Sequence, residues 1–404
     1  MLKLKTPEEM QNSYSPLYFL SALGAGGLSI SFFLYLMFWL PHPNTPIPTF
    51  TDVSQYFSQP WQWQHAVFIL AMAAMLILAA IFVRMLVWNL KAYKLFQQTQ
   101  AYQQLKESNA ETQRFAIPLT LAMGVNVSLA LGAVFIPGLW SVVEYLFPVA
   151  IAAFAVIGYF AARMYLGFFA RVMATGGFDC TKNNNLGQAL PAFAFSMVAV
   201  GLAASVAMST NPITQTVALV LSVLFFIVAL VLAIFKVVFG LRAMFEHGAA
   251  AEGLPTFLVV IPIVTLLAIS VIRWQHGLHN FEAFGHSAPI GVWLTGLIAL
   301  QLMFGAMGLA MKKRMNYFKT FVAGEKKSPA SLALICPGVA LVVLGMFWIN
   351  KGLLPMLPEE LAKFGVAYML LYVPFIYLQL RTLTLYFKLG NKLLGKEPVR
   401  LQTA

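Results

Sequence analysis

Charged residues are scarce in this sequence of 404 residues. Only 10% of the residues are Asp, Glu, Lys or Arg, whereas soluble domains carry about 25%. Hydrophobic residues make up 60% of the chain, and its mean hydropathy is +0.78. This composition excludes a soluble globular domain and indicates an integral membrane protein.

Cysteine is equally rare, because Cys180 and Cys336 are the whole complement. Two thiols are too few for a disulfide scaffold or a thiolate metal site. The apolar runs contain no nucleophile–base pair, no Gly-rich phosphate loop and no pair of haem ligands. We therefore expect no catalytic residue and no cofactor, and the protein is not predicted to be an enzyme.

Histidines cluster once, in the stretch "RWQHGLHNFEAFGHS". Their spacing matches no specific pattern of metal ligands. We interpret the stretch as a solvated loop and predict no metal site from its members His276, His279, His286 and Glu282.

Ten apolar runs are long enough to cross the hydrocarbon core of a bilayer. The first is too long for the apolar region of a signal peptide. Residues 1–404 are therefore predicted to form a single transmembrane domain, with spans near 16–40, 65–90, 115–137, 142–171, 188–209, 214–244, 255–274, 289–311, 329–349 and 363–388.

The basic residues test this number of spans independently. If both termini are cytoplasmic, all but three of the 26 Lys and Arg residues fall on the cytoplasmic side. Cytoplasmic loops carry such an excess, and one missed span would destroy the asymmetry. Topology thus explains the net charge of +12 without a nucleic-acid partner. The exceptions are Arg273, Lys351 and Lys363.

A repeat underlies the ten spans. Odd spans open with a proline, which a first helical turn tolerates, and a second helix breaker follows: Pro16 with Gly24, Pro118 with Gly124, Pro191 with Gly201, Pro255 with Pro262 and Pro329 with Pro337. Even spans end with an arginine followed by aromatic residues. These arginines are Arg84, Arg163, Arg242, Arg314 and Arg381.

Odd and even spans also differ in side-chain size. From Ser21 to Ser31, eight of eleven residues are Gly, Ala or Ser, whereas even spans are bulkier. Small residues favour close helix packing. We predict an all-α fold of five tandem hairpins, with the odd helices in an inner ring around a quasi-fivefold axial pore. Tight packing without a pore is the alternative.

The first span carries the most specific family signal: Tyr18-Phe19, Leu23-Gly24, Leu28-Ser29 and Phe32-Phe33. With five hairpins, it resembles the tellurite-resistance/dicarboxylate transporter family, which includes slow anion channels and TehA-type channels. The resemblance implies a homotrimer in which each subunit has its own pore for small anions. It also implies a phenylalanine gate in the ninth span.

No phenylalanine occupies the middle of the ninth span "SPASLALICPGVALVVLGMFW". Pro337 or Ile335 stands near that place, and Phe193, Phe195 and Phe257 are substitute gate candidates, unless they are core or lipid-facing aromatics. The candidates for lining the pore are Ser21, Gly24, Ser29, Gly124, Asn126, Ser128, Ser196, Pro262 and Thr265. Their hydroxyl and amide groups either serve the solute or bond within the helices.

Ionisable groups are absent from the centres of the odd spans. Glu144, Arg273 and Lys363 lie near outer ends, and the five repeated arginines lie near inner ends. These arginines either anchor the helices at the lipid interface or form a cationic inner vestibule that attracts anions. Without a buried acid, a proton relay is hard to build, which favours a channel or uniporter.

The sequence thus predicts a passive channel or facilitative transporter for a small inorganic or carboxylate anion. It would lie in the bilayer of the inner (plasma) membrane, multi-pass, with both termini cytoplasmic. A coupled transporter of C4-dicarboxylate or sulfite is one alternative. A non-transporting membrane scaffold subunit is another, although it leaves the fivefold recurrence of the hairpin unexplained.

Overall fold

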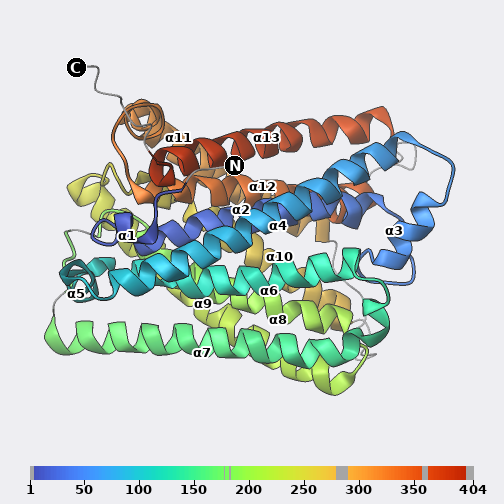
Figure 1. Ribbon diagram of the computed structural model, residues 1–404, viewed down its shortest axis with the longest axis horizontal. Coiled ribbons are helices and arrows are strands. Elements are labelled where there is room, and N and C mark those ends of the chain that lie inside the picture. Colours follow the sequence, from blue (N-terminus) through green and yellow to red (C-terminus); the bar gives the residue numbers. More distant parts are fainter. Residues whose placement is uncertain (1–3, 177, 182, 279–289, 357–362, 397–404) are drawn as a thin grey trace.

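The computed structural model describes residues 4–176, 178–181, 183–278, 290–356 and 363–396 (Figure 1). Over these ranges the chain is helical and contains no β-strand. Ten of its helices are long and apolar enough to cross a membrane. This confirms the predicted all-α class and the predicted number of apolar helices. The protein is therefore a multi-pass membrane protein.

Five of these helices, which we call the inner helices, are each preceded by a 3₁₀ turn. The turns are η1 (Pro16–Tyr18), η2 (Asn109–Phe115), η4 (Gly187–Ala189), η5 (Leu254–Val259) and η7 (Pro329–Leu334). The helices that follow them are α2 (Phe19–Trp39), α6 (Ala116–Phe135), α8 (Leu190–Met208), α10 (Val260–Leu278) and α12 (Ile335–Phe347).

The other five, the outer helices, alternate with the inner ones along the chain. They are α4 (Trp63–Phe96), α7 (Val143–Thr175), α9 (Pro212–His247), α11 (Ile290–Arg314) and α13 (Val366–Leu394). Several run past the limits predicted from hydropathy, because they continue into polar and basic residues that hydropathy does not assign to a span, such as Lys94 in the last turn of α4 and Lys392 in the last turn of α13.

Short elements complete the chain. They are α1 (Pro7–Met10), α3 (Phe50–Phe57), α5 (Gln100–Glu107), η3 (Leu139–Val142), the π-helical segments η6 (Phe318–Ala323) and η8 (Trp348–Leu353), and η9 (Leu354–Met356). The long helices run along the longest axis of the molecule, with α3 at one end and α1 and α5 at the other (Figure 1).

Burial separates the two sets of helices. In the most apolar 18-residue stretch of each inner span, 61% to 100% of the residues are buried, against 22% to 33% in each outer span. The small residues of the inner helices allow this close approach, whereas the bulky residues of the outer helices are exposed. Exposed apolar side chains on a membrane protein face lipid.

The inner helices contact one another in a closed order: α2 with α6, α6 with α8, α8 with α10, α10 with α12, and α12 with α2. The five 3₁₀ turns contact one another in the same order. The inner helices therefore all begin at one end of the molecule. Each inner helix also contacts the outer helix that follows it in the chain.

Glycines of the inner helices receive aromatic rings from the outer helices. A Cβ atom added to Gly201 of α8 would overlap the ring of Phe154 of α7, and one added to Gly345 of α12 would overlap Phe375 of α13. Helices α2, α6 and α8 nevertheless run without interruption through Gly24, Gly124 and Gly201. These glycines therefore serve close helix packing without breaking the helix.

Polar side chains of the outer helices fix the inner helices by buried hydrogen bonds. Gln379 of α13 donates to Ser31 Oγ over 2.8 Å, and Gln301 of α11 donates to the carbonyl of Ile261 over 2.9 Å. Asn89 of α4 donates to Ser21 Oγ of α2 over 3.4 Å. Such bonds specify how neighbouring helices are placed in an apolar medium.

Candidate functional site

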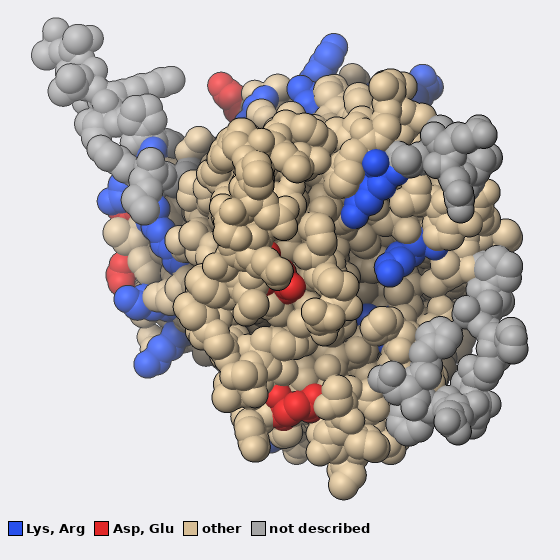
Figure 2. Space-filling view, turned by 90° about the vertical axis from the view of Figure 1, so that its right-hand side faces the viewer, with Lys and Arg blue, Asp and Glu red and all other residues tan. Residues whose placement is uncertain are grey.

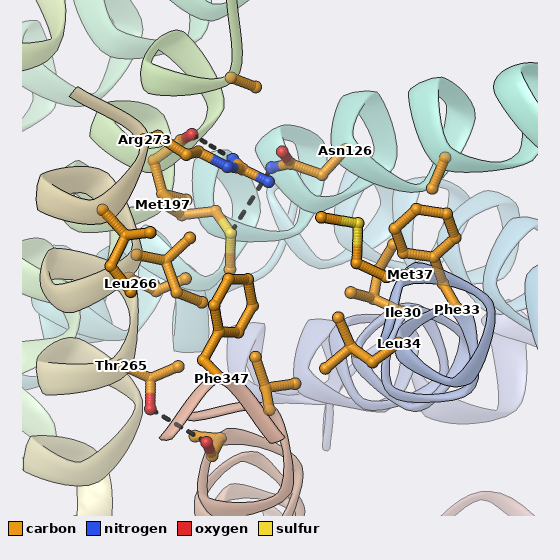
Figure 3. A pocket seen from close by; sticks show the side chains of 18 of the residues that line it. Ile30, Phe33, Leu34, Met37, Asn126, Met197, Thr265, Leu266, Arg273 and Phe347 are labelled. Atoms are coloured by element: carbon orange, nitrogen blue, oxygen red, sulfur yellow. Dashed lines mark hydrogen bonds between the residues drawn. The ribbon is translucent and has the colours of Figure 1, made fainter. Parts of the chain in front are cut away.

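A cavity of about 510 Å³ lies between the inner helices. Residues from α2, α6, α8, α10 and α12 all line it (Figure 3). Its walls are mostly apolar, with side chains such as Ile30, Phe33 and Leu34 of α2 facing Leu266 of α10 and Phe347 of α12. Pockets of this size and character hold small molecules in many proteins.

The cavity has a closed end and an open end. Near the starts of the inner helices it stops at Leu23, Phe193, Pro262 and Cys336, all of which are buried. The 3₁₀ turns that contact one another lie beyond that level. At the other end the lining includes the exposed residues His276 and Lys351. The face at that end, shown in Figure 2, carries few charged side chains.

Arg273 of α10 lines this cavity. Its Nη1 donates a hydrogen bond to the carbonyl oxygen of Val200 in α8 over 2.7 Å. In Figure 3 the guanidinium extends toward the side-chain amide of Asn126. No described carboxylate forms an ion pair with Arg273, and an arginine side chain stays protonated in proteins. The guanidinium therefore brings a net positive charge to the cavity wall.

The basic residues of the described lining have no acidic counterpart in it. Besides Arg273, the described lining includes Lys351 and His276 but no aspartate or glutamate. Low-dielectric walls strengthen the field of a charge inside a cleft, and a cleft of one sign concentrates counter-ions. The cavity is thus electrostatically suited to an anion.

Two neutral polar residues of the lining, Asn126 and Thr265, are occupied by bonds to the protein. The amide nitrogen of Asn126 donates to the carbonyl of Ala122 over 3.1 Å and to the sulfur of Met197 over 3.8 Å. The hydroxyl of Thr265 lies 3.1 Å from the carbonyl oxygen of Ala340. Arg273 has further N–H groups that can serve a solute, and Gln275 and Lys351 also bring N–H donors to the lining.

Of the candidates for lining the pore, Gly24, Asn126, Pro262 and Thr265 line the cavity. The remaining five lie outside its lining and have local contacts. Ser21, Ser128 and Ser196 donate to carbonyls of their own helical segment. Ser29 donates to the carbonyl of Met75 in α4, and Gly124 lies against Phe82 of α4.

Among the gate candidates, Phe193 lines the cavity and is 3% exposed. Phe195 stacks on Phe225 of α9 with ring centroids 6.0 Å apart, and Phe257 packs on Phe304 of α11 at 5.7 Å. Both therefore point toward the outer helices. The last two candidates are buried in α12 outside the lining: Ile335, whose side chain lies against Gly24, and Pro337.

The five repeated arginines all lie on outer helices and outside the cavity lining. Four of them, Arg163, Arg242, Arg314 and Arg381, are exposed, and Arg242 forms an ion pair with Glu246 at 2.8 Å. Their positions fit anchoring at the lipid interface, where long basic side chains reach the headgroups.

The histidine loop lies largely outside the described residues, because His279, Glu282 and His286 fall in the range 279–289. Within the described ranges no group of three or more His, Cys, Asp or Glu residues is placed to hold a metal ion. His276 lies in the described part and lines the cavity mouth.

Sequence reasoning missed the cationic residues of the cavity. Arg273 was assigned to the outer end of its span, yet its side chain lines the cavity. A signal was present: Arg273 and Lys351 are two of the three exceptions to the cytoplasmic bias of basic residues. Arg273 and Lys351 both line the cavity. A place in the cavity wall accounts for basic residues at the end of the spans opposite to the other basic residues.

Comparisons with models of protein families, with curated proteins and with solved structures found no match to this chain.

Proposed function

We propose that this protein lets anions cross the membrane passively, as a channel or facilitative transporter, through the cavity between its inner helices. Ten apolar helices fit a membrane channel or transporter in general. The observation that carries the anion specificity is Arg273, a charged side chain in the wall of a mostly apolar cavity whose described lining contains no acidic residue.

The proposed architecture is that of five hairpins repeated in parallel around a quasi-fivefold axis. Three observations support it: the inner spans are more buried than the outer ones, the inner helices contact one another in a closed order, and each contacts the outer helix that follows it. A closed ring of parallel inner helices encloses an axial path, which explains why one hairpin recurs five times.

The described conformation is proposed to be closed on the cytoplasmic side. The cavity ends at Leu23 and Phe193, which are 2% and 3% exposed, and apolar constrictions stop ions by excluding water. We propose Phe193 as the gate residue, since it alone of the three phenylalanine candidates lines the cavity.

Several properties rest on the resemblance of the first span to the tellurite-resistance/dicarboxylate transporter family and on the distribution of basic residues. They are proposed as follows: membership of that family, a homotrimer, location in the inner membrane, and both termini in the cytoplasm. The described cavity lining offers no carboxylate for proton coupling, which favours passive transport over a coupled dicarboxylate or sulfite transporter.

The test is anion efflux from proteoliposomes that contain the purified full-length protein. We expect the wild type to release chloride, nitrate or malate faster than protein-free vesicles. Arg273→Gln should lower this rate by about 10- to 100-fold, the effect of losing one charge-assisted hydrogen bond, whereas Arg273→Lys should retain part of it.

Arg163→Gln is the matched control, because Arg163 is an exposed arginine on α7 outside the cavity lining. Equal efflux from wild type and Arg273→Gln would contradict the anion site. Efflux indistinguishable from empty vesicles, in the wild type and in Phe193→Ala alike, would favour the scaffold alternative.

A further inference from the structure

The composition of the cavity wall carries information on the kind of anion. Aliphatic side chains are the most numerous in it, and they are joined by four methionines and three phenylalanines: Met37, Met123, Met197, Met208, Phe33, Phe193 and Phe347. Methionine is flexible and polarizable, so it adapts to apolar groups of different shape. This wall resembles a binding site for an apolar group more than a lining for a hydrated ion.

A small inorganic anion would find few hydrogen-bond donors in the cavity. Its hydration shell must be replaced when it enters an apolar space, because an unpaired charge there is very costly. Asn126 and Thr265 already bond to protein groups, and one N–H of Arg273 is held by Val200. One guanidinium can satisfy one anionic group, and most of the remaining surface offers apolar contact, although Gln275, His276 and Lys351 also line the cavity.

The volume of the cavity leads to the same conclusion. At about 510 Å³, the space is far larger than a single inorganic ion needs and falls within the range of pockets for small organic ligands. An anionic group on Arg273 leaves the neighbouring apolar walls of α2 and α12 free for the rest of the molecule.

We propose, on the basis of the function proposed above, that the preferred solute is an organic monoanion with an apolar body. Its carboxylate or sulfonate group binds the guanidinium of Arg273. Its apolar body packs against Met37, Phe33 and Phe347. A dicarboxylate fits less well, because its second charge would face these apolar walls.

Two sulfonates test the proposal without interference from passive membrane leak. Benzenesulfonate and methanesulfonate carry the same charged group and stay ionised at any working pH, so they differ only in the apolar body. Their binding to the full-length protein in lipid nanodiscs is measured by titration calorimetry, with chloride and malate for comparison.

We expect benzenesulfonate to bind at least about tenfold more tightly than methanesulfonate, because burial of the ring adds apolar contact. Met37→Ala should weaken benzenesulfonate about threefold or more and leave methanesulfonate unchanged. Met303→Ala is the matched control, since Met303 is exposed on the outer helix α11 and should alter neither affinity.

The outcomes separate this proposal from the proposed function. Equal affinity for the two sulfonates, a preference for malate or chloride, or the absence of sulfonate binding would each overturn the organic monoanion. Binding of both sulfonates that Arg273→Gln leaves unchanged would instead refute Arg273 as the anion site. Tight benzenesulfonate binding that depends on both Arg273 and Met37 is the result we predict.

Discussion

Arg273 of α10 donates a hydrogen bond from Nη1 to the backbone carbonyl of Val200 in α8, over 2.7 Å. A carbonyl oxygen orients a guanidinium but does not neutralise it, because it carries no net charge. An ion pair with a carboxylate would have cancelled the field in the cavity. The bond to Val200 thus holds the side chain in the wall and leaves its charge available to an anion.

Because inner and outer helices pack closely, we expect one substitution to compensate the loss of stability caused by another. Gly201→Ala places a methyl group where the ring of Phe154 lies, and such overpacking costs about 1–3 kcal/mol. We expect Gly201→Ala to lower the thermal unfolding temperature in detergent and Phe154→Leu to restore part of the loss.

Gly167→Ala is the control for this pair. Nothing lies within 4 Å of a Cβ atom at Gly167 of α7, so this substitution should leave stability unchanged or raise it by up to about 1 kcal/mol. If Gly201→Ala were as stable as Gly167→Ala, the proposed contact between α7 and α8 would be wrong.

Substitution of two phenylalanines of α8 by alanine should affect anion efflux differently. Phe193→Ala removes an apolar side chain from the closed end of the cavity, so we expect a rise in anion efflux of about tenfold or more. Phe195→Ala removes a ring that stacks on Phe225 and should lower stability without raising efflux. Efflux that rises in Phe195→Ala and not in Phe193→Ala would remove Phe193 as the gate residue.

Cys336 provides a natural probe of the electrostatic potential in the cavity, because it lines the space and is 9% exposed. In a Cys180→Ser background, we expect an anionic methanethiosulfonate to modify Cys336 faster than a cationic one. Each rate is normalised to that of free cysteine and followed by mass spectrometry. The normalised ratio should be about tenfold or more and should fall in Arg273→Gln; a ratio that favours the cation would contradict an anion-selective cavity.

His42, in the connection between α2 and α3, should make the stability of the folded protein depend on pH. Burial lowers the pKa of its imidazole, and Lys363 and Lys351 act in the same direction, while the carbonyl of Leu40 and Asp52 oppose the shift. Below about pH 6.5, the unfolded chain binds the proton before the folded one does. Protonation therefore favours unfolding, and stability declines as the pH falls from 6.5 toward the lower pKa of the folded state.

We expect His42→Asn to reduce this acid-dependent loss. The check compares thermal unfolding of both proteins at pH 7.5 and pH 5.0. If acidification destabilised wild type and His42→Asn by the same amount, the lowered pKa of His42 would have no part in the acid sensitivity.

The number of membrane helices could be predicted from the sequence, because span length and the placement of basic residues constrain it independently. The contrast between small residues in odd spans and bulky ones in even spans also reflects a physical requirement. Gly201 is small because the ring of Phe154 occupies the adjacent space, and such a contact leaves a composition signal along the chain.

The cavity residues were harder to predict, because the direction of a side chain depends on helix rotation. Ser29 and Gly124 lie on the same helices as Gly24 and Asn126, yet they face α4 and the latter pair faces the cavity. Both sides of an inner helix are buried, so hydropathy does not distinguish them. Arg273 was missed because its position near the outer end of its span does not show which way its side chain points.

The most direct test of anion passage is the reversal potential of the purified protein in a planar bilayer under a KCl gradient, recorded with Phe193→Ala to keep the path open. We predict a value near the chloride equilibrium potential, a shift when chloride is replaced by nitrate or benzenesulfonate, and loss of most of the current in Arg273→Gln. A reversal potential at the potassium equilibrium value, or one unaffected by exchange of the anion, would contradict the account.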